Sequence, residues 1–161
     1  MPFDRSILDT YATGGDLLRA SIVGLTREDL LAYPVPGTWS IQEIVIHLQD
    51  SDLVGIHRMQ RIAAENNPLV IGYDETKFVQ TLRSDLQSIE DAVTIFDLSR
   101  RQFARVLRAL PDEAFERTGV HNEVGKIKLG EQVKKYHEHL LHHLKYVKEK
   151  RRLLGKPLSY E

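Results

Sequence analysis

Apolar side chains recur every three or four positions along four long segments of the chain, residues 4–23, 40–66, 86–110 and 130–154. This spacing places them on one side of an α-helix and leaves charged side chains on the other side. The first segment is interrupted by Gly14 and Gly15, which weaken a helix, so we expect this segment to be bent. The pattern therefore predicts four amphipathic helices, each with one face to bury.

Local sequence signals set the ends of these helices. Ser40 and Glu43 have the spacing of a capping box, in which each side chain hydrogen-bonds the backbone amide of the other residue, so we expect the second helix to begin directly after Ser40. Pro111 ends the third helix, and Gly155 followed by Pro157 ends the fourth. These boundaries do not depend on tertiary contacts.

The connections between the predicted helices are long. Residues 33–37 contain two prolines and a glycine and form a loop, residues 75–82 predict a short helix, and residues 115–129 predict a loop or a small hairpin. Four amphipathic helices joined in this way are typical of a helical bundle. We therefore predict an all-α fold, an antiparallel four-helix bundle with long connecting loops, as a single domain over residues 1–161.

Composition narrows the classes of function. The chain has no cysteine, which excludes disulfides, thiolate metal ligands and a thiol nucleophile of its own. Lys plus Arg number 22 against 23 Asp plus Glu, so the basic excess of nucleic-acid-binding proteins is lacking. The N-terminus does not resemble a signal peptide, and no apolar run reaches the roughly 18 residues of a membrane span. We expect a cytoplasmic protein that binds neither nucleic acid nor a membrane.

Four of the seven histidines lie within Tyr136–Leu144. His139 and His143 are one helical turn apart, so both imidazoles can face the same ion, and a helical projection places His47 on a comparable flank of the second helix. Three histidines with one open coordination position are the arrangement expected of catalytic zinc and related divalent ions. Spacing alone also fits a pair of surface histidines, so at this point the three residues are candidate ligands.

The same projection assigns the other histidines to different surroundings. His142 faces away from the candidate pair and His137 lies on the opposite edge of the helix, whereas His57 and His121 are expected at the protein surface.

Two features of the charged residues also lead to expectations. The outer face of the third helix is basic and is expected to be solvated, with Arg100, Arg101, Arg105 and Arg108 on it. Asp52 falls inside the apolar stripe of the second helix. Because a buried carboxylate needs a partner, we expect it to be bonded to a loop amide, to Trp39 or to an arginine.

Several catalytic classes lack their sequence signals. There is no H-E-x-x-H of zinc peptidases, no E-x-x-H of di-iron bundles and no glycine-rich phosphate-binding loop. Ser51, His47 and Asp50 could form a serine triad on paper, but no nucleophile-elbow sequence surrounds the serine.

Three phrases of the sequence carry a family resemblance: T-W-S-I-Q-E-I-V-I-H-L-Q-D-S-D at 38–52, G-K-I-K-L-G-E-Q at 125–132 and Y-H-E-H-L-L-H-H-L at 136–144. Together they resemble the DinB/YfiT-like superfamily of metal-binding four-helix bundles, which includes bacillithiol and mycothiol S-transferases. The resemblance implies that His47, His139 and His143 are the metal ligands and that His142 is not one. It also implies a homodimer.

We therefore expect a divalent transition metal, zinc or nickel, that activates a low-molecular-weight thiol for transfer to an electrophile. Asp50, Ser51, Tyr136 or Arg58 could orient a substrate, but the sequence assigns no catalytic residue. Two alternatives use the same ligands: a metal-dependent hydrolase, and a metal-binding stress or interaction module without turnover.

Overall fold

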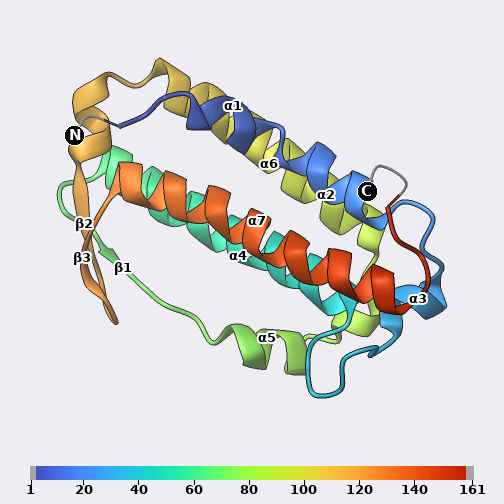
Figure 1. Cartoon of the computed structure of the whole chain (residues 1–161). Coiled ribbons are helices and arrows are strands. Elements are labelled where there is room, and N and C mark those ends of the chain that lie inside the picture. Colours follow the sequence, from blue (N-terminus) through green and yellow to red (C-terminus); the bar gives the residue numbers. More distant parts are fainter. Residues whose placement is uncertain (1–2, 159–161) are drawn as a thin grey trace.

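The computed structural model describes residues 3–158 and shows four helical rods packed side by side (Figure 1). The rods are α1 (Ile7–Ala12) with α2 (Gly14–Ile22), α4 (Ile41–Ala64), α6 (Ile89–Ala109) and α7 (Leu129–Leu153). The predicted four-helix bundle is confirmed, and the expected bend of the first rod is a break between two helices at Thr13.

The predicted capping box is present at the start of α4. The Ser40 hydroxyl accepts from the Glu43 amide at 3.1 Å, and the Glu43 carboxylate accepts from the Ser40 amide at 2.6 Å. Because two amides that have no partner within the helix are satisfied by these side chains, the first turn of α4 is fixed locally.

The connections contain the shorter elements: α3 (Arg27–Leu31), α5 (Glu75–Thr81), the 3₁₀ helices η1 (Ser84–Leu86) and η2 (Asp112–Glu116), and the strands β1 (Leu69–Val70), β2 (Thr118–His121) and β3 (Gly125–Lys128). The hairpin considered for residues 115–129 is β2–β3, with Gly119 opposite Ile127. Strand β1 adds a parallel pair, with Leu69 opposite Val120. A strand of two residues has no periodicity, so the sequence did not indicate it.

The rods run in two directions. The α1–α2 rod and α7 run one way, and α4 and α6 run the other way (Figure 1). Consecutive rods α4 and α6 run in parallel because residues 65–88 return along the outside of the bundle, as an extended segment followed by α5. This returning segment covers one side of α4.

The buried apolar side chains form two clusters, one in each half of the bundle. The first includes Leu8, Met59, Phe103 and Val133. The second includes Leu18, Ile44, Phe96 and Leu140. In every rod, the residues between these two clusters include polar or very small ones, so a polar layer crosses the bundle at mid-height.

An ion pair between Asp52 and Arg100 lies in this layer. The Arg100 guanidinium donates to both Asp52 carboxylate oxygens at 2.6 and 2.8 Å and to the Tyr136 carbonyl at 2.7 Å, and both charged side chains are at most 1% exposed. The ring faces of Tyr11 and Phe96 lie 4.6 and 4.3 Å from the guanidinium carbon. The predicted arginine partner of Asp52 is therefore present.

The same ion pair corrects one expectation. Arg100 was expected on a solvated basic face of the third helix, but it is fully buried. A periodicity argument assigns charged positions to solvent, whereas here a carboxylate on α4 compensates the buried guanidinium. Gly14 belongs to this arrangement, because a Cβ atom there would lie 2.7 Å from the Arg100 guanidinium.

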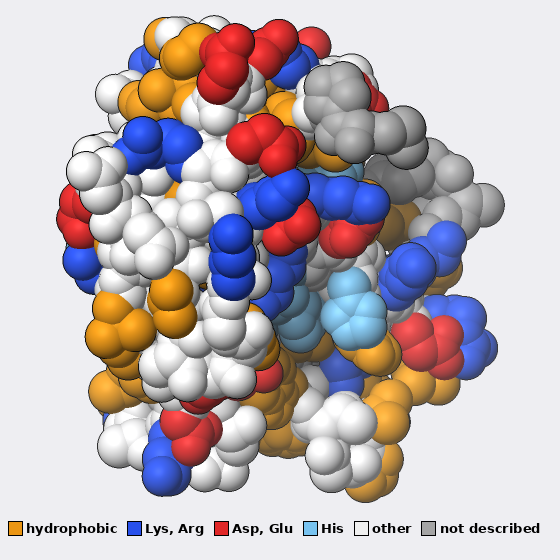
Figure 2. Space-filling model, turned by 90° about the vertical axis from the view of Figure 1, so that its left-hand side faces the viewer, with side chains coloured by type: hydrophobic (Ala, Val, Ile, Leu, Met, Phe, Trp, Pro, Cys, Tyr) orange, Lys and Arg blue, Asp and Glu red, His pale blue; other side chains and the backbone are white. Residues whose placement is uncertain are grey.

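The surface carries both signs of charge. Acidic and basic side chains are interspersed over the face drawn in Figure 2, in keeping with the formal net charge of -1, and histidine side chains reach the surface between them. Within residues 3–158, no helix combines the length and the apolar character needed to cross a membrane.

The ion pair leads to a prediction for stability. Asp52→Asn leaves the Arg100 charge buried without compensation, so we expect the free energy of unfolding to fall by about 3–5 kcal/mol. Urea unfolding followed by circular dichroism measures this change. Asp97→Asn is the matched control. Its partner Arg101 is 53% exposed, so the charge that this substitution leaves unpaired is still solvated. A loss below about 1 kcal/mol for Asp52→Asn would contradict a structural role of the pair.

Candidate metal centre

The structure brings the three predicted histidines together. His47 lies in the second turn of α4, and His139 and His143 lie one turn apart on the facing side of α7. The Nε2 atom of His139 is 3.1 Å from Nε2 of His47 and 3.1 Å from Nε2 of His143. The helices α4 and α7 run in opposite directions, and at the three histidines the N-terminal part of α4 lies beside the middle of α7.

The donor set fits a metal ion. All three residues offer one ligand atom within 4.8 Å of the others. Three imidazole nitrogens bound tetrahedrally at roughly 2.0–2.1 Å from zinc are about 3.3 Å apart, close to the 3.1 Å observed. A hydrogen bond between two imidazoles accounts for one such contact, but His139 Nε2 has two. Convergence on a common ion explains both.

Burial keeps these imidazoles neutral. His47 is 2% exposed. Burial, with a smaller contribution from His143, lowers the pKa of His47 to about 4. The pKa of His143 is lowered to about 4, and that of His139 to about 3, again mainly by burial. Neutral imidazole is the form that binds a metal, so at neutral pH all three candidate ligands of the folded chain are in the metal-binding form.

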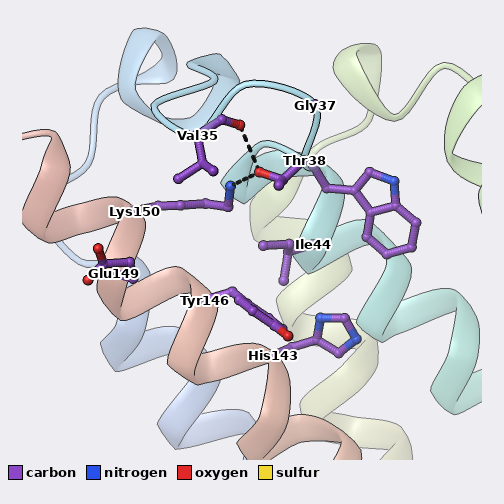
Figure 3. Close-up of a pocket in the computed structure, with 9 residues that line it drawn as sticks. Val35, Gly37, Thr38, Ile44, His143, Tyr146, Glu149 and Lys150 are labelled. Atoms are coloured by element: carbon purple, nitrogen blue, oxygen red, sulfur yellow. Dashed lines mark hydrogen bonds between the residues drawn. The ribbon is translucent and has the colours of Figure 1, made fainter.

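Aromatic rings enclose the centre on one side. The Trp39 ring lies 4.8 Å from the His47 ring and is stacked on His143 at 6.3 Å. A pocket of about 610 Å³ opens here, with Trp39 and His143 in its wall (Figure 3). The candidate centre therefore borders a space of the size that small-molecule sites have.

A carboxylate that the sequence did not indicate lies beside the histidines. The Glu75 carboxylate is 4.0 Å from His47 Nε2, and its side chain is 56% exposed. Glu75 is the first residue of α5, which the segment returning along the bundle places next to α4. The sequence predicted a short helix at this position. Glu75 is distant in sequence from all three histidines, so the sequence did not indicate that it lies beside them.

Two of the four residues considered for substrate orientation contact each other. Arg58 donates to the Tyr136 hydroxyl at 3.2 Å and to the Ile71 carbonyl at 2.6 Å, so it fastens the returning segment to the bundle. The Tyr136 ring is 6.3 Å from the His139 ring. Ser51 is buried and Asp50 is half-buried. Tyr136 thus borders the centre, and Arg58 contacts the Tyr136 hydroxyl.

The remaining histidines lie elsewhere. His142 and His57 are exposed, as expected. His121 was expected at the surface but is 8% exposed, because it lies on β2 opposite Val70 of β1. Its Nδ1 accepts from the Glu123 amide at 3.2 Å. The helical projection gave no information on a residue outside the helices.

Comparison with known proteins matches the chain to one family model and to relatives whose names refer to a metal. The sequence model of the DinB superfamily matches residues 10–147. A protein of Oceanobacillus iheyensis, provisionally named a metal-dependent hydrolase, is 28% identical over 131 residues, which cover 81% of this chain and 76% of that protein. A Bacillus cereus protein with the same provisional name is 27% identical over 158 residues, which cover 96% of this chain and 91% of that protein.

One solved structure has the same fold. It is YfiT from Bacillus subtilis, described as "a probable metal-dependent hydrolase with an unusual four-helix bundle topology". The TM-score is 0.88 at 22% sequence identity, and the match covers 93% of this chain and 86% of that chain.

The geometry predicts metal content. Protein purified after exposure to zinc or nickel should hold about one equivalent per chain, and His47→Ala or His143→Ala should lose most of it, because two imidazoles do not complete the site. Elemental analysis by mass spectrometry measures this. His142→Ala is the control from the same helical turn and should keep its metal. Full retention in both ligand variants would rule out the three-histidine site.

A second prediction concerns pH in the metal-free protein. The unfolded imidazoles protonate near pH 6.5, whereas the folded ones have pKa values of about 3 to 4. The unfolded state therefore binds more protons between these values, so stability should fall as pH is lowered from about 6.5 to about 4. Urea midpoints at pH 7 and pH 5 measure the loss. A variant with all three histidines changed to Gln should lose less, and equal losses would contradict the assignment.

Proposed function

The chain belongs to the DinB superfamily, and we propose that it is a metal-dependent transferase that activates a low-molecular-weight thiol and joins it to an electrophile. The convergence of His47, His139 and His143 supports this proposal, because His143 also lines a pocket of about 610 Å³. When bound there, a divalent ion such as zinc or nickel would lower the pKa of a coordinated thiol or water and so supply a nucleophile at neutral pH.

The absence of cysteine from the chain supports an external thiol. No thiolate of the protein competes for the open coordination position, so a small thiol that enters the pocket can take it. The three imidazoles are neutral, so a metal ion would not have to displace a proton from them in order to bind.

The residues around the centre have separate tasks in this proposal. Trp39, stacked on His143, limits the access of bulk water to the reacting atoms. The Glu75 carboxylate, 4.0 Å from His47, accepts the proton that the nucleophile releases. Tyr136, held by Arg58, offers its hydroxyl as a hydrogen-bond donor beside His139.

A metal-dependent hydrolase is the second candidate, and one observation favours it. Glu75 stands where a general base for an attacking water would be needed, and the relatives described above carry the provisional name of metal-dependent hydrolases. Hydrolysis uses the same three histidines and differs only in the molecule that takes the open position.

The partners and surroundings expected from the sequence stay predictions. They are the homodimer, the cytoplasmic location and the lack of a nucleic-acid partner.

An activity screen separates the candidates. Zinc- or nickel-loaded protein is incubated with a panel of small thiols and a chromogenic electrophile, and separately with chromogenic esters and amides without thiol. We expect metal-dependent consumption of a thiol that is lost in His139→Ala. Cleavage of an ester or amide without thiol would instead assign the hydrolase, and no turnover in either assay would leave a metal-binding module.

The Glu75→Gln variant tests the proton acceptor in whichever assay shows turnover. A general base contributes about 10²–10⁴-fold to rate, so we expect a loss of at least about 100-fold with unchanged metal content. Glu28→Gln, an exposed carboxylate of α3, is the control. An unchanged rate for Glu75→Gln would remove this residue from the mechanism.

A further inference from the structure

The pocket beside the metal centre has apolar walls and one charged end. Trp39, Ile44 and Tyr146 line it. His143 brings the metal centre to one side of it (Figure 3). At the other end the Lys150 side chain extends from α7 toward Thr38 (Figure 3). The pocket therefore joins a candidate reaction centre to a single ammonium group.

Lys150 is buried with little to compensate its charge. The residue is 3% exposed, and its Nζ donates to the Thr38 hydroxyl at 2.6 Å. The Thr38 hydroxyl donates in turn to the Val35 carbonyl at 2.9 Å. Within residues 3–158, no carboxylate oxygen forms a salt bridge with Lys150. One neutral hydroxyl is poor compensation for a buried ammonium, which has three N–H donors.

Two carboxylates that could offer a counter-charge already have partners of their own. Glu149 also lines the pocket, but its carboxylate pairs with Arg152 at 2.8 Å. Glu43 attracts the Lys150 charge from a distance, but its oxygens accept from the Ser40 amide at 2.6 Å and the Tyr33 hydroxyl at 3.1 Å. Lys150 lines the pocket, and within residues 3–158 only one of its three N–H donors has a hydrogen-bond partner.

We propose that Lys150 binds the carboxylate of the small molecule whose reactive end lies at the three histidines. His143 and Lys150 are seven residues apart on one helix, two turns, so the two ends of the site are about 10 Å apart. The ligand class is an elongated molecule with a metal-binding group at one end, an apolar or aromatic middle that fits between Trp39 and Tyr146, and a carboxylate at the other end.

This inference rests on the proposed metal centre but not on the reaction that occurs there. A lysine that only ties α7 to the loop at Thr38 would affect stability and leave ligand preference unchanged. Lys150 is therefore tested as a residue that determines specificity, through the preference between two ligands that differ only in their terminal group.

The test uses two hydroxamates that bind zinc without any turnover: suberic acid monohydroxamate, which ends in a carboxylate, and octanohydroxamic acid, which ends in a methyl group. Trp39 is the only tryptophan of the chain and lies in the pocket wall, so its fluorescence reports binding to the zinc-loaded protein. A charge-assisted hydrogen bond should favour the carboxylate compound by about tenfold or more.

The variants isolate the charge of Lys150. In Lys150→Met the preference should fall to about twofold or less, while the affinity for octanohydroxamic acid stays the same. Lys150→Arg keeps the charge and should keep most of the preference. Lys145→Gln, an exposed lysine of the same helix, is the matched control and should behave as the wild type. Metal content and thermal unfolding are measured for each variant, to show that the fold and the centre are intact.

The outcomes separate this inference from the proposed function. No preference in the wild type, or a full preference in Lys150→Met, would overturn the role of Lys150 even if thiol transfer is observed. A preference that depends on Lys150 would support it even if neither transfer nor hydrolysis is found. If neither hydroxamate binds the zinc-loaded wild type, the inference falls, whereas the metal centre is judged separately by the measured metal content.

Discussion

The rest of this structure depends on the buried ion pair between Asp52 and Arg100. It joins α4 to α6, and through the Tyr136 carbonyl it also joins both to α7. Apolar clusters tolerate small shifts of one helix along another, but a buried charge must meet its partner at one height. Tyr136 precedes His139 by three residues, so the contact that fixes the register of α7 also sets the height at which His139 meets His47. The main contribution of the Asp52–Arg100 pair is therefore to fix the register of α4, α6 and α7 relative to one another.

The returning segment at residues 65–88 is the second feature on which the site depends. A bundle with short hairpin connections would leave the metal-facing side of α4 open. Here the chain passes over that side before α6 begins, and Arg58 fastens it through the Ile71 carbonyl. As a result, the carboxylate of Glu75, a residue of the short connecting helix α5, lies beside the three histidines. The histidine set and the carboxylate beside it thus come from different parts of the topology, one from the rods and one from a connection.

Much of the fold and the candidate ligand set could be predicted because their signals are local. The capping box at Ser40 satisfies its own amides, and the 3.6-residue period places His139 and His143 on one face whatever packs against them. The errors at Arg100 and His121 have the opposite cause. Each is buried beside an element distant in sequence, α4 with Asp52 for Arg100 and strand β1 for His121, and a periodicity argument cannot include such a partner. Glu75 and Lys150 belong to the same class, since their significance is their proximity to groups on other elements.

The sequence by itself determined four amphipathic helices, their ends and three histidines on matching flanks, because helix periodicity and capping involve only residues a few positions apart. Only the tertiary structure decided how these parts combine. It paired Arg100 with Asp52, ran α4 and α6 in the same direction, and placed Glu75 at the centre and Lys150 at the end of its pocket. These outcomes depend on which surfaces bury one another and which charges must then be compensated, and that is a property of the whole packed chain.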